Sequence, residues 1–120
     1  MSVVAGVLVG ILAVLHAYFL VLEMFLWNTP TGRRVFGTTG EFAAASASLA
    51  ANQGLYNGFL AAGLVWSLLA HDPVRFPAAV FFCVCVVVAG AYGAVTANRR
   101  ILFVQAVPGA LALLFVLLAH

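Results

Sequence analysis

The stretch SVVAGVLVGILAVLHAYFLVLEMFLW, residues 2–27, decides the fold class. It contains one histidine and one glutamate but no arginine or lysine, and it exceeds the ~20 apolar residues that a helix needs to cross a bilayer. Three further apolar runs follow at about residues 42–70, 78–97 and 101–119. The sequence therefore predicts an all-α, polytopic membrane protein whose 120 residues form a single four-transmembrane-helix bundle.

The composition supports this assignment. Hydrophobic residues make up 66% of the chain and charged residues only 7%, without a single lysine, which is unlike a soluble domain of this size. The runs are continuous and lack the alternation of outward and inward residues that membrane β-strands need. The polar separators NTPTGRRVFGTTG, HDPVRFP and TANRR contain all five arginines and read as connections between helices.

The arginines predict the orientation of the bundle. Arg33 and Arg34 lie between the first two runs and Arg99 and Arg100 between the last two, whereas Arg75 lies alone in the remaining separator. Because positive charge is retained in the cytoplasm, we expect a multi-pass protein of the bacterial inner membrane with both termini outside. The connections are short, so any chemistry belongs between the helices or at the cytoplasmic mouth.

Two ionisable residues within the first run are the candidate catalytic residues. His16 and Glu23 are seven residues apart and therefore share one helix face. An ionisable group inside a membrane helix is a functional-site hypothesis because its insertion is costly. One alternative is that Glu23 forms a structural ion pair with a nearby arginine, and another is that His16 is a hydrogen-bonded core residue.

The segment AANQGLYNG, residues 50–58, is the densest polar island within the runs. Counting inward from the expected helix ends predicts two polar layers, one around His16 and one around Glu23. Gly54 and Gly58 form a G-x-x-x-G motif, which indicates close helix packing. The predicted substrate-binding residues are Asn52, Gln53, Tyr56 and Asn57 near the deeper layer, and Tyr92 and Gln105 near the shallower one. A T-x-x-E pattern from Thr38 to Glu41 predicts the start of the second helix.

Two patterns together resemble the bacterial domain of unknown function family 1304. The first is N-Q-G-x-Y-N-G-F-L-A-A-G in the second run, and the second is R-x-x-x-V-Q-x-x-P, formed by Arg100, Val104, Gln105 and Pro108. The resemblance covers nearly the whole chain. It implies a small four-helix membrane protein and no particular activity.

A weaker likeness is to the membrane-associated eicosanoid and glutathione metabolism proteins, which are four-helix trimers. Thr38–Phe42 is similar to a loop of that family, and Asn52 and Tyr56 match the spacing of two glutathione contacts. The family's arginine and glutamate positions are occupied here by Ser48 and Leu55. The likeness therefore implies the bundle and a trimer, but not glutathione binding.

These features leave three hypotheses about function. The first is a polar site within the membrane that binds or processes a small lipophilic molecule. The second is a proton-coupled small-molecule transporter, against which the strong arginine bias argues, and the third is a non-catalytic assembly or stability factor. The expected partners are membrane lipid, a small lipophilic ligand and further copies of the chain in a dimer or trimer, without nucleic acid. No metal site is expected, and the sequence indicates no particular cofactor.

Overall fold

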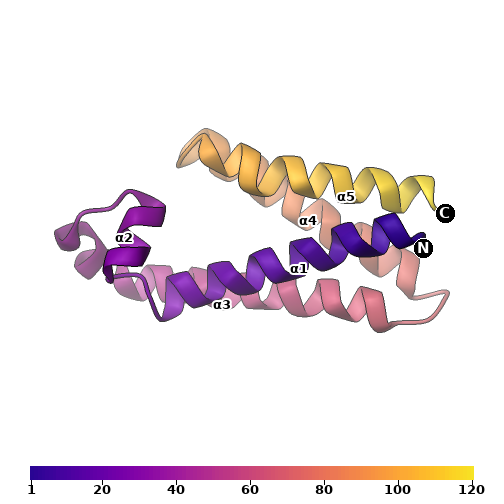
Figure 1. The fold of residues 1–120 in the computed structure, drawn as a ribbon, viewed down its shortest axis with the longest axis horizontal. Helices are drawn as coiled ribbons and strands as arrows, with labels where there is room; N and C mark the ends of the chain where they lie inside the picture. Colours follow the sequence, from indigo (N-terminus) through magenta and orange to yellow (C-terminus); the bar gives the residue numbers. More distant parts are fainter. The chain divides into compact units, whose positions relative to one another are not determined.

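The computed structural model describes all residues, Met1–His120, and contains helices and no strands (Figure 1). The helices are α1 (Val3–Met24), α2 (Pro30–Phe36), α3 (Gly40–Leu69), α4 (Arg75–Thr96) and α5 (Val107–Leu118), and a π-helical segment, η1 (Leu102–Ala106), leads into α5. The all-α prediction is confirmed. The four expected helices correspond to α1, α3, α4 and η1 with α5, whereas α2 was not expected.

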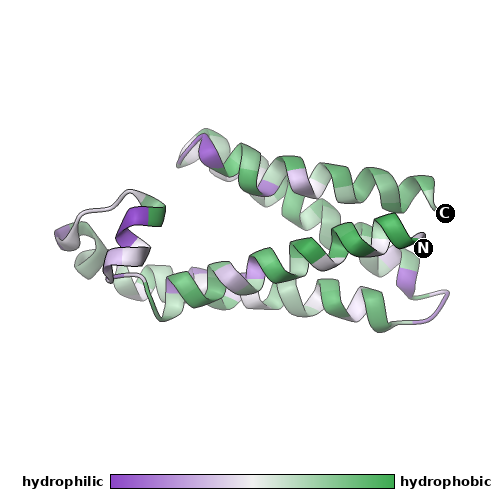
Figure 2. Ribbon diagram, in the orientation of Figure 1, coloured by the Kyte–Doolittle hydropathy of each residue, from purple (hydrophilic) through white to green (hydrophobic).

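Apolar residues dominate three of these helices. Helices α1 and α4 are each 22 residues long with a hydropathy of 2.4, so both are long and apolar enough to cross a membrane. Figure 2 shows that α5 is similarly apolar, while hydrophilic residues lie on α2, along α3, in the α3–α4 connection and in the turn before η1. By length and composition, the chain therefore contains two candidate membrane spans.

The chain divides into two compact units, and α1 and α3 contribute to both. The first unit consists of Met1–Val14 and Leu60–His120, and α4 lies beside η1 and α5 within it (Figure 1). A β-carbon added at Gly90 of α4 would lie 2.5 Å from the backbone nitrogen of Ala106. The absence of a side chain at Gly90 therefore brings the two helix backbones together. The buried core of this unit includes Val9, Leu12, Leu64, Cys83, Val86, Ala112 and Val116.

The π-helical segment has a local cause in the sequence. Pro108 has no N–H and cannot donate to the carbonyl four residues earlier, so the regular α-helical ladder cannot continue through it. Just before the proline, the Val107 N–H reaches the carbonyl of Leu102, which is a five-residue step. The turn widens where the chain approaches Gly90, so the close contact and the π-helical turn coincide.

The second unit, Leu15–Phe59, contains the connection that sequence reasoning treated as a loop. Thr29 caps α2 because its side-chain oxygen accepts from the Gly32 N–H at 3.2 Å, and Pro30 occupies the first turn. The Trp27 indole donates to Ser46 Oγ at 3.1 Å, and its ring packs on Phe36 with centroids 4.8 Å apart. Residues 25–36 therefore fold back against the N-terminal part of α3.

The start of α3 differs by one residue from the predicted cap. Thr39, not Thr38, accepts from the Phe42 N–H, at 3.1 Å, and so caps the helix. The hydroxyl of Thr38 is buried without a hydrogen-bond partner. Gly37 explains the shift, because its φ of 67° places it in the left-handed region at the end of α2 and turns the chain directly into α3.

Candidate functional site

The candidate site is a buried pair of polar side chains on α1 and α3. Glu23 lies one residue before the end of α1, and Asn57 lies in the middle of α3. The Asn57 Nδ2 donates to Glu23 Oε1 at 2.5 Å, and the two residues are 4% and 9% exposed. Burial of a carboxyl group is costly unless it is hydrogen-bonded, so Asn57 provides compensation from the neighbouring helix.

The glycines on either side of Asn57 explain how the two helices come so close. A β-carbon at Gly54 would lie 2.7 Å from Met24 Cγ and 3.0 Å from Glu23 Cβ. A β-carbon at Gly58 would lie 2.6 Å from Leu20 Cδ1. The G-x-x-x-G motif therefore packs α3 on α1, as its spacing predicted, and the contact aligns Asn57 with Glu23.

The pair retains the capacity to accept further hydrogen bonds. No protein group donates to Glu23 Oε2 or to Asn57 Oδ1. Neither atom is among the fully buried side-chain atoms that lack a partner, because Thr38 Oγ1 is the one such atom in the chain. The two acceptors of the pair are therefore not sealed from the surface. Arg33 is engaged elsewhere, since its Nη1 donates to Asn28 Oδ1 at 2.9 Å. The geometry suits a group that donates hydrogen bonds.

His16 lies on the same face of α1 as Glu23, as the spacing predicted. It is fully buried and contacts Phe19 edge to face, with ring centroids 5.5 Å apart. The face of α1 that carries Glu23 therefore has a second buried polar group two turns away. No group of three or more histidine, cysteine, aspartate or glutamate side chains is placed to hold a metal ion.

Within the second unit, the other predicted binding residues of α3 do not join this pair. On α3, Asn52 and Gln53 are exposed and Tyr56 is 58% exposed. In the first unit, Tyr92 of α4 is 72% exposed and Gln105 is half-buried in η1. Of the four predicted binding residues on α3, Asn57 is the one that bonds Glu23.

The predicted division into two polar layers is wrong for Asn57, which was assigned to the layer of His16. The prediction assumed that helix ends at residues 27 and 42 lie at equal depth. Because residues 25–36 fold back, as the Trp27–Ser46 bond shows, the first turns of α3 extend past the end of α1. The signal that identifies the partner is local: Asn57 lies between Gly54 and Gly58 on the face that packs on α1.

Comparisons with known proteins cover all of these residues. The sequence model of a family described as "Protein of unknown function (DUF1304)" matches residues 10–117. The "Uncharacterized protein YpaA" of Lactococcus lactis subsp. lactis (strain IL1403) is 28% identical over 116 residues, which cover 95% of this chain and 94% of that protein. No solved structure matches the chain significantly.

Proposed function

The chain belongs to the DUF1304 family, and from this premise we propose that it is an integral inner-membrane protein whose working site is the Glu23–Asn57 pair. The site binds a small lipophilic molecule that carries a hydrogen-bond donor, such as an alcohol or an amine. One observation carries the proposal: a buried carboxyl group, bonded to one carboxamide through Oε1, has a second acceptor oxygen that no protein group bonds.

The proposed membrane topology includes two helices in addition to α1 and α4. We propose that α3 and the helix formed by Leu102–Leu118 also cross, which gives four spans. The 30 residues of α3 measure about 45 Å at 1.5 Å per residue, more than the ~30 Å of hydrocarbon. Its first turns, which begin beside Glu41, then reach the cytoplasmic surface together with α2.

The proposed orientation gives the first prediction. Reporter tags on either terminus are expected to locate outside the cytoplasm, because four of the five arginines flank the connections assigned to the inside. Alkaline phosphatase and green fluorescent protein fusions measure this directly. A cytoplasmic signal from both ends would reverse the orientation. A mixed signal would support a small transporter that inserts in both orientations to form antiparallel dimers.

The chemistry of the pair limits the ligand class. An ammonium group can donate to both Glu23 Oε2 and Asn57 Oδ1, whereas a hydroxyl, which has one hydrogen, donates to one of them. The apolar side chains of α1 and α3 would surround a hydrocarbon body. If the ligand is also transformed, Glu23 is the proton acceptor and His16 the group that returns a proton or holds the product. A transporter would use the same carboxyl group to exchange a proton for a cation.

Exposed carboxamides on α3 support the proposal that the protein is a homo-oligomer. Asn52 and Gln53 lie on the exposed side of this helix. A polar group that faces hydrocarbon without a partner costs several kcal/mol, whereas carboxamides of neighbouring helices can bond each other. A dimer or trimer would give these side chains partners that one copy does not provide.

The second prediction concerns Glu23→Gln and tests the proposed function. Glutamine can still accept from Asn57 Nδ2, but it replaces the second acceptor oxygen with a donor amide. We expect retention of decylamine and decanol to fall about tenfold or more, since a hydrogen bond to a carboxylate contributes ~1.5–3 kcal/mol. Native mass spectrometry of protein in nanodiscs measures retention and subunit number together, with decane as the probe that lacks a donor.

Glu41→Gln is the matched control for this experiment. Glu41 is exposed in the first turn of α3, so its substitution removes the same group without touching the pair. Unchanged retention in Glu41→Gln and reduced retention at preserved melting in Glu23→Gln would support the site. Loss of assembly in Glu23→Gln, with no probe bound by the parent protein, would instead favour the assembly factor.

A further inference from the structure

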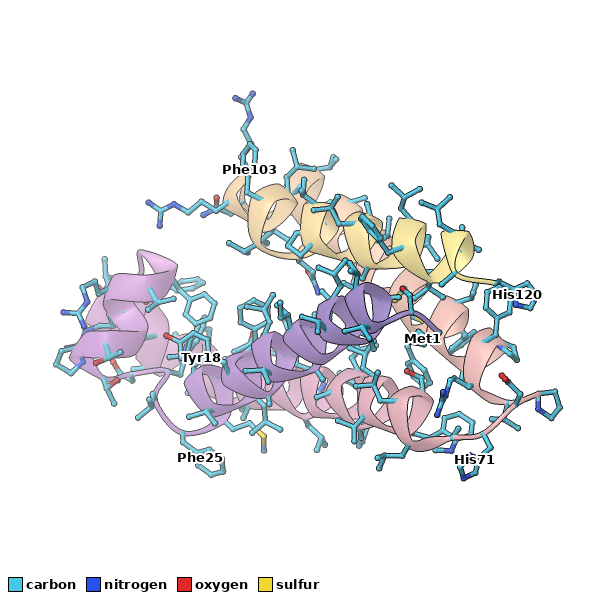
Figure 3. All side chains as sticks on the ribbon, turned by 45° about the vertical axis from the view of Figure 1, so that its right-hand side comes forward. Met1, Tyr18, Phe25, His71, Phe103 and His120 are labelled. Carbon is cyan, nitrogen blue, oxygen red and sulfur yellow. The ribbon has the colours of Figure 1, made fainter.

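A small pocket lies at one end of the first unit, where the α3–α4 connection passes the end of α5. Its volume is about 150 Å³. Its apolar lining is formed by Met1, Phe76, Val116 and Ala119, and its polar lining, here called the rim, is formed by Asp72, Arg75 and His120. Figure 3 labels Met1 and His120 at this end, and His71 on the α3–α4 connection. None of these residues belongs to the Glu23 site.

The rim presents separate positive and negative groups. Arg75 Nε donates to the carbonyl of Ala70 at 2.8 Å, which ties the guanidinium to the end of α3 and leaves its two Nη groups for another acceptor. Asp72 is exposed and forms no ion pair with Arg75. The His120 ring stacks on Phe76 with centroids 3.7 Å apart and closes one side of the pocket.

An apolar groove is lined by other residues of the same connection. Its volume is about 380 Å³, and its lining includes Trp66, Pro73, Val74, Pro77 and Phe81. The connection and first turn of α4 therefore separate a charged pocket, reached by Asp72 and Arg75, from a groove that offers almost only carbon. A tryptophan at a helix end beside such a groove is typical of the interfacial zone of a bilayer.

We propose that this end of the unit binds a phospholipid with a phosphoethanolamine headgroup. The Arg75 guanidinium bonds the phosphate, and Asp72 accepts from the ammonium group. A pocket of about 150 Å³ has room for a phosphate with a short aminoalkyl arm. One acyl chain passes Pro73 and lies in the groove.

The mixed charge of the rim decides between lipid classes. A phosphoglycerol headgroup brings a negative charge without an ammonium, so Asp72 opposes it while Arg75 attracts it. A phosphoethanolamine headgroup is matched at both positions. The wild-type protein is therefore expected to prefer phosphoethanolamine, and removal of the Asp72 charge is expected to shift that preference toward phosphoglycerol.

The test is native mass spectrometry of the untagged full chain with phosphoethanolamine and phosphoglycerol lipids that carry identical acyl chains. Arg75→Gln is expected to reduce retention of both lipids about tenfold, because it removes the charge-assisted phosphate bonds. Asp72→Asn is expected to lower the ratio of retained phosphoethanolamine to phosphoglycerol. Arg99→Gln, at an exposed arginine of another connection, is the control and is expected to change neither value.

A substitution in the groove tests whether this end of the unit binds a whole lipid or only a headgroup. Val74 is 42% exposed, so Val74→Trp fills the groove from its edge without replacing a buried side chain. It is expected to weaken retention of both lipids and to leave their ratio unchanged. Equal retention of the two lipids by the wild type, or no effect of Arg75→Gln at preserved melting, would overturn the proposal. If soluble O-phosphoethanolamine displaces the bound lipid and Val74→Trp has no effect on retention, the proposal that the occupant is a lipid would be overturned.

Discussion

Replacement of Gly90 by alanine is expected to lower the free energy of unfolding by about 1–3 kcal/mol, the usual cost of an overpacked core. The new β-carbon would lie 2.5 Å from the backbone nitrogen, 2.7 Å from Cα and 2.9 Å from Cβ of Ala106. A flexible side chain could move away, but the backbone of η1 cannot move without separating α4 from α5. The expected result is a lower melting temperature of the purified protein in detergent.

Gly93→Ala is the matched control for Gly90→Ala. A β-carbon there would lie 3.1 Å from Ile101 Cγ2, the end of a side chain that can adjust by a few tenths of an ångström. Both substitutions gain ~1 kcal/mol of helix propensity, so the difference between the two variants isolates the backbone clash. Equal melting temperatures would show that α4 and η1 do not pack closely through Gly90.

The sequence predicted the long helices well because their signal is continuous. Apolar runs bounded by arginines, prolines and glycines located α1, α3, α4 and the Leu102–Leu118 helix to within a few residues of their ends. The short helix α2 was missed because Thr29, Pro30 and Gly37 are turn formers as well as helix-capping residues. In the folded chain, the Gly32 N–H bonds Thr29 Oγ1 and Gly37 ends the helix.

The candidate site was predictable in part. The polarity of His16, Glu23 and Asn57 within apolar runs marked them for burial, and the structure buries all three. Polarity could not distinguish Asn57 from the exposed Asn52 and Gln53 on the same helix. That choice depends on the register between α1 and α3, which the folded connection and the two glycines determine together.

Substitution of Asn57 by leucine is expected to destabilise the second unit by about 3 kcal/mol, because it leaves the buried Glu23 oxygen without its donor. A buried acceptor that loses its donor still costs the full free energy of its desolvation. A pair of apolar side chains of similar volume carries no such cost. The double variant Glu23→Leu with Asn57→Leu is therefore expected to melt closer to the wild type than Asn57→Leu alone.

Asn28→Leu is the matched control, since Asn28 forms an exposed hydrogen bond with Arg33 and its loss is expected to change stability by no more than ~0.5 kcal/mol. Melting of the wild type, Glu23→Leu, Asn57→Leu, the double variant and Asn28→Leu, combined with retention of decylamine, separates the two roles of the pair. Recovery of stability without recovery of binding in the double variant would mean that the pair is retained for its chemistry. A double variant as unstable as the sum of its single substitutions would show that shape, and not hydrogen bonding, joins α1 to α3 at this point.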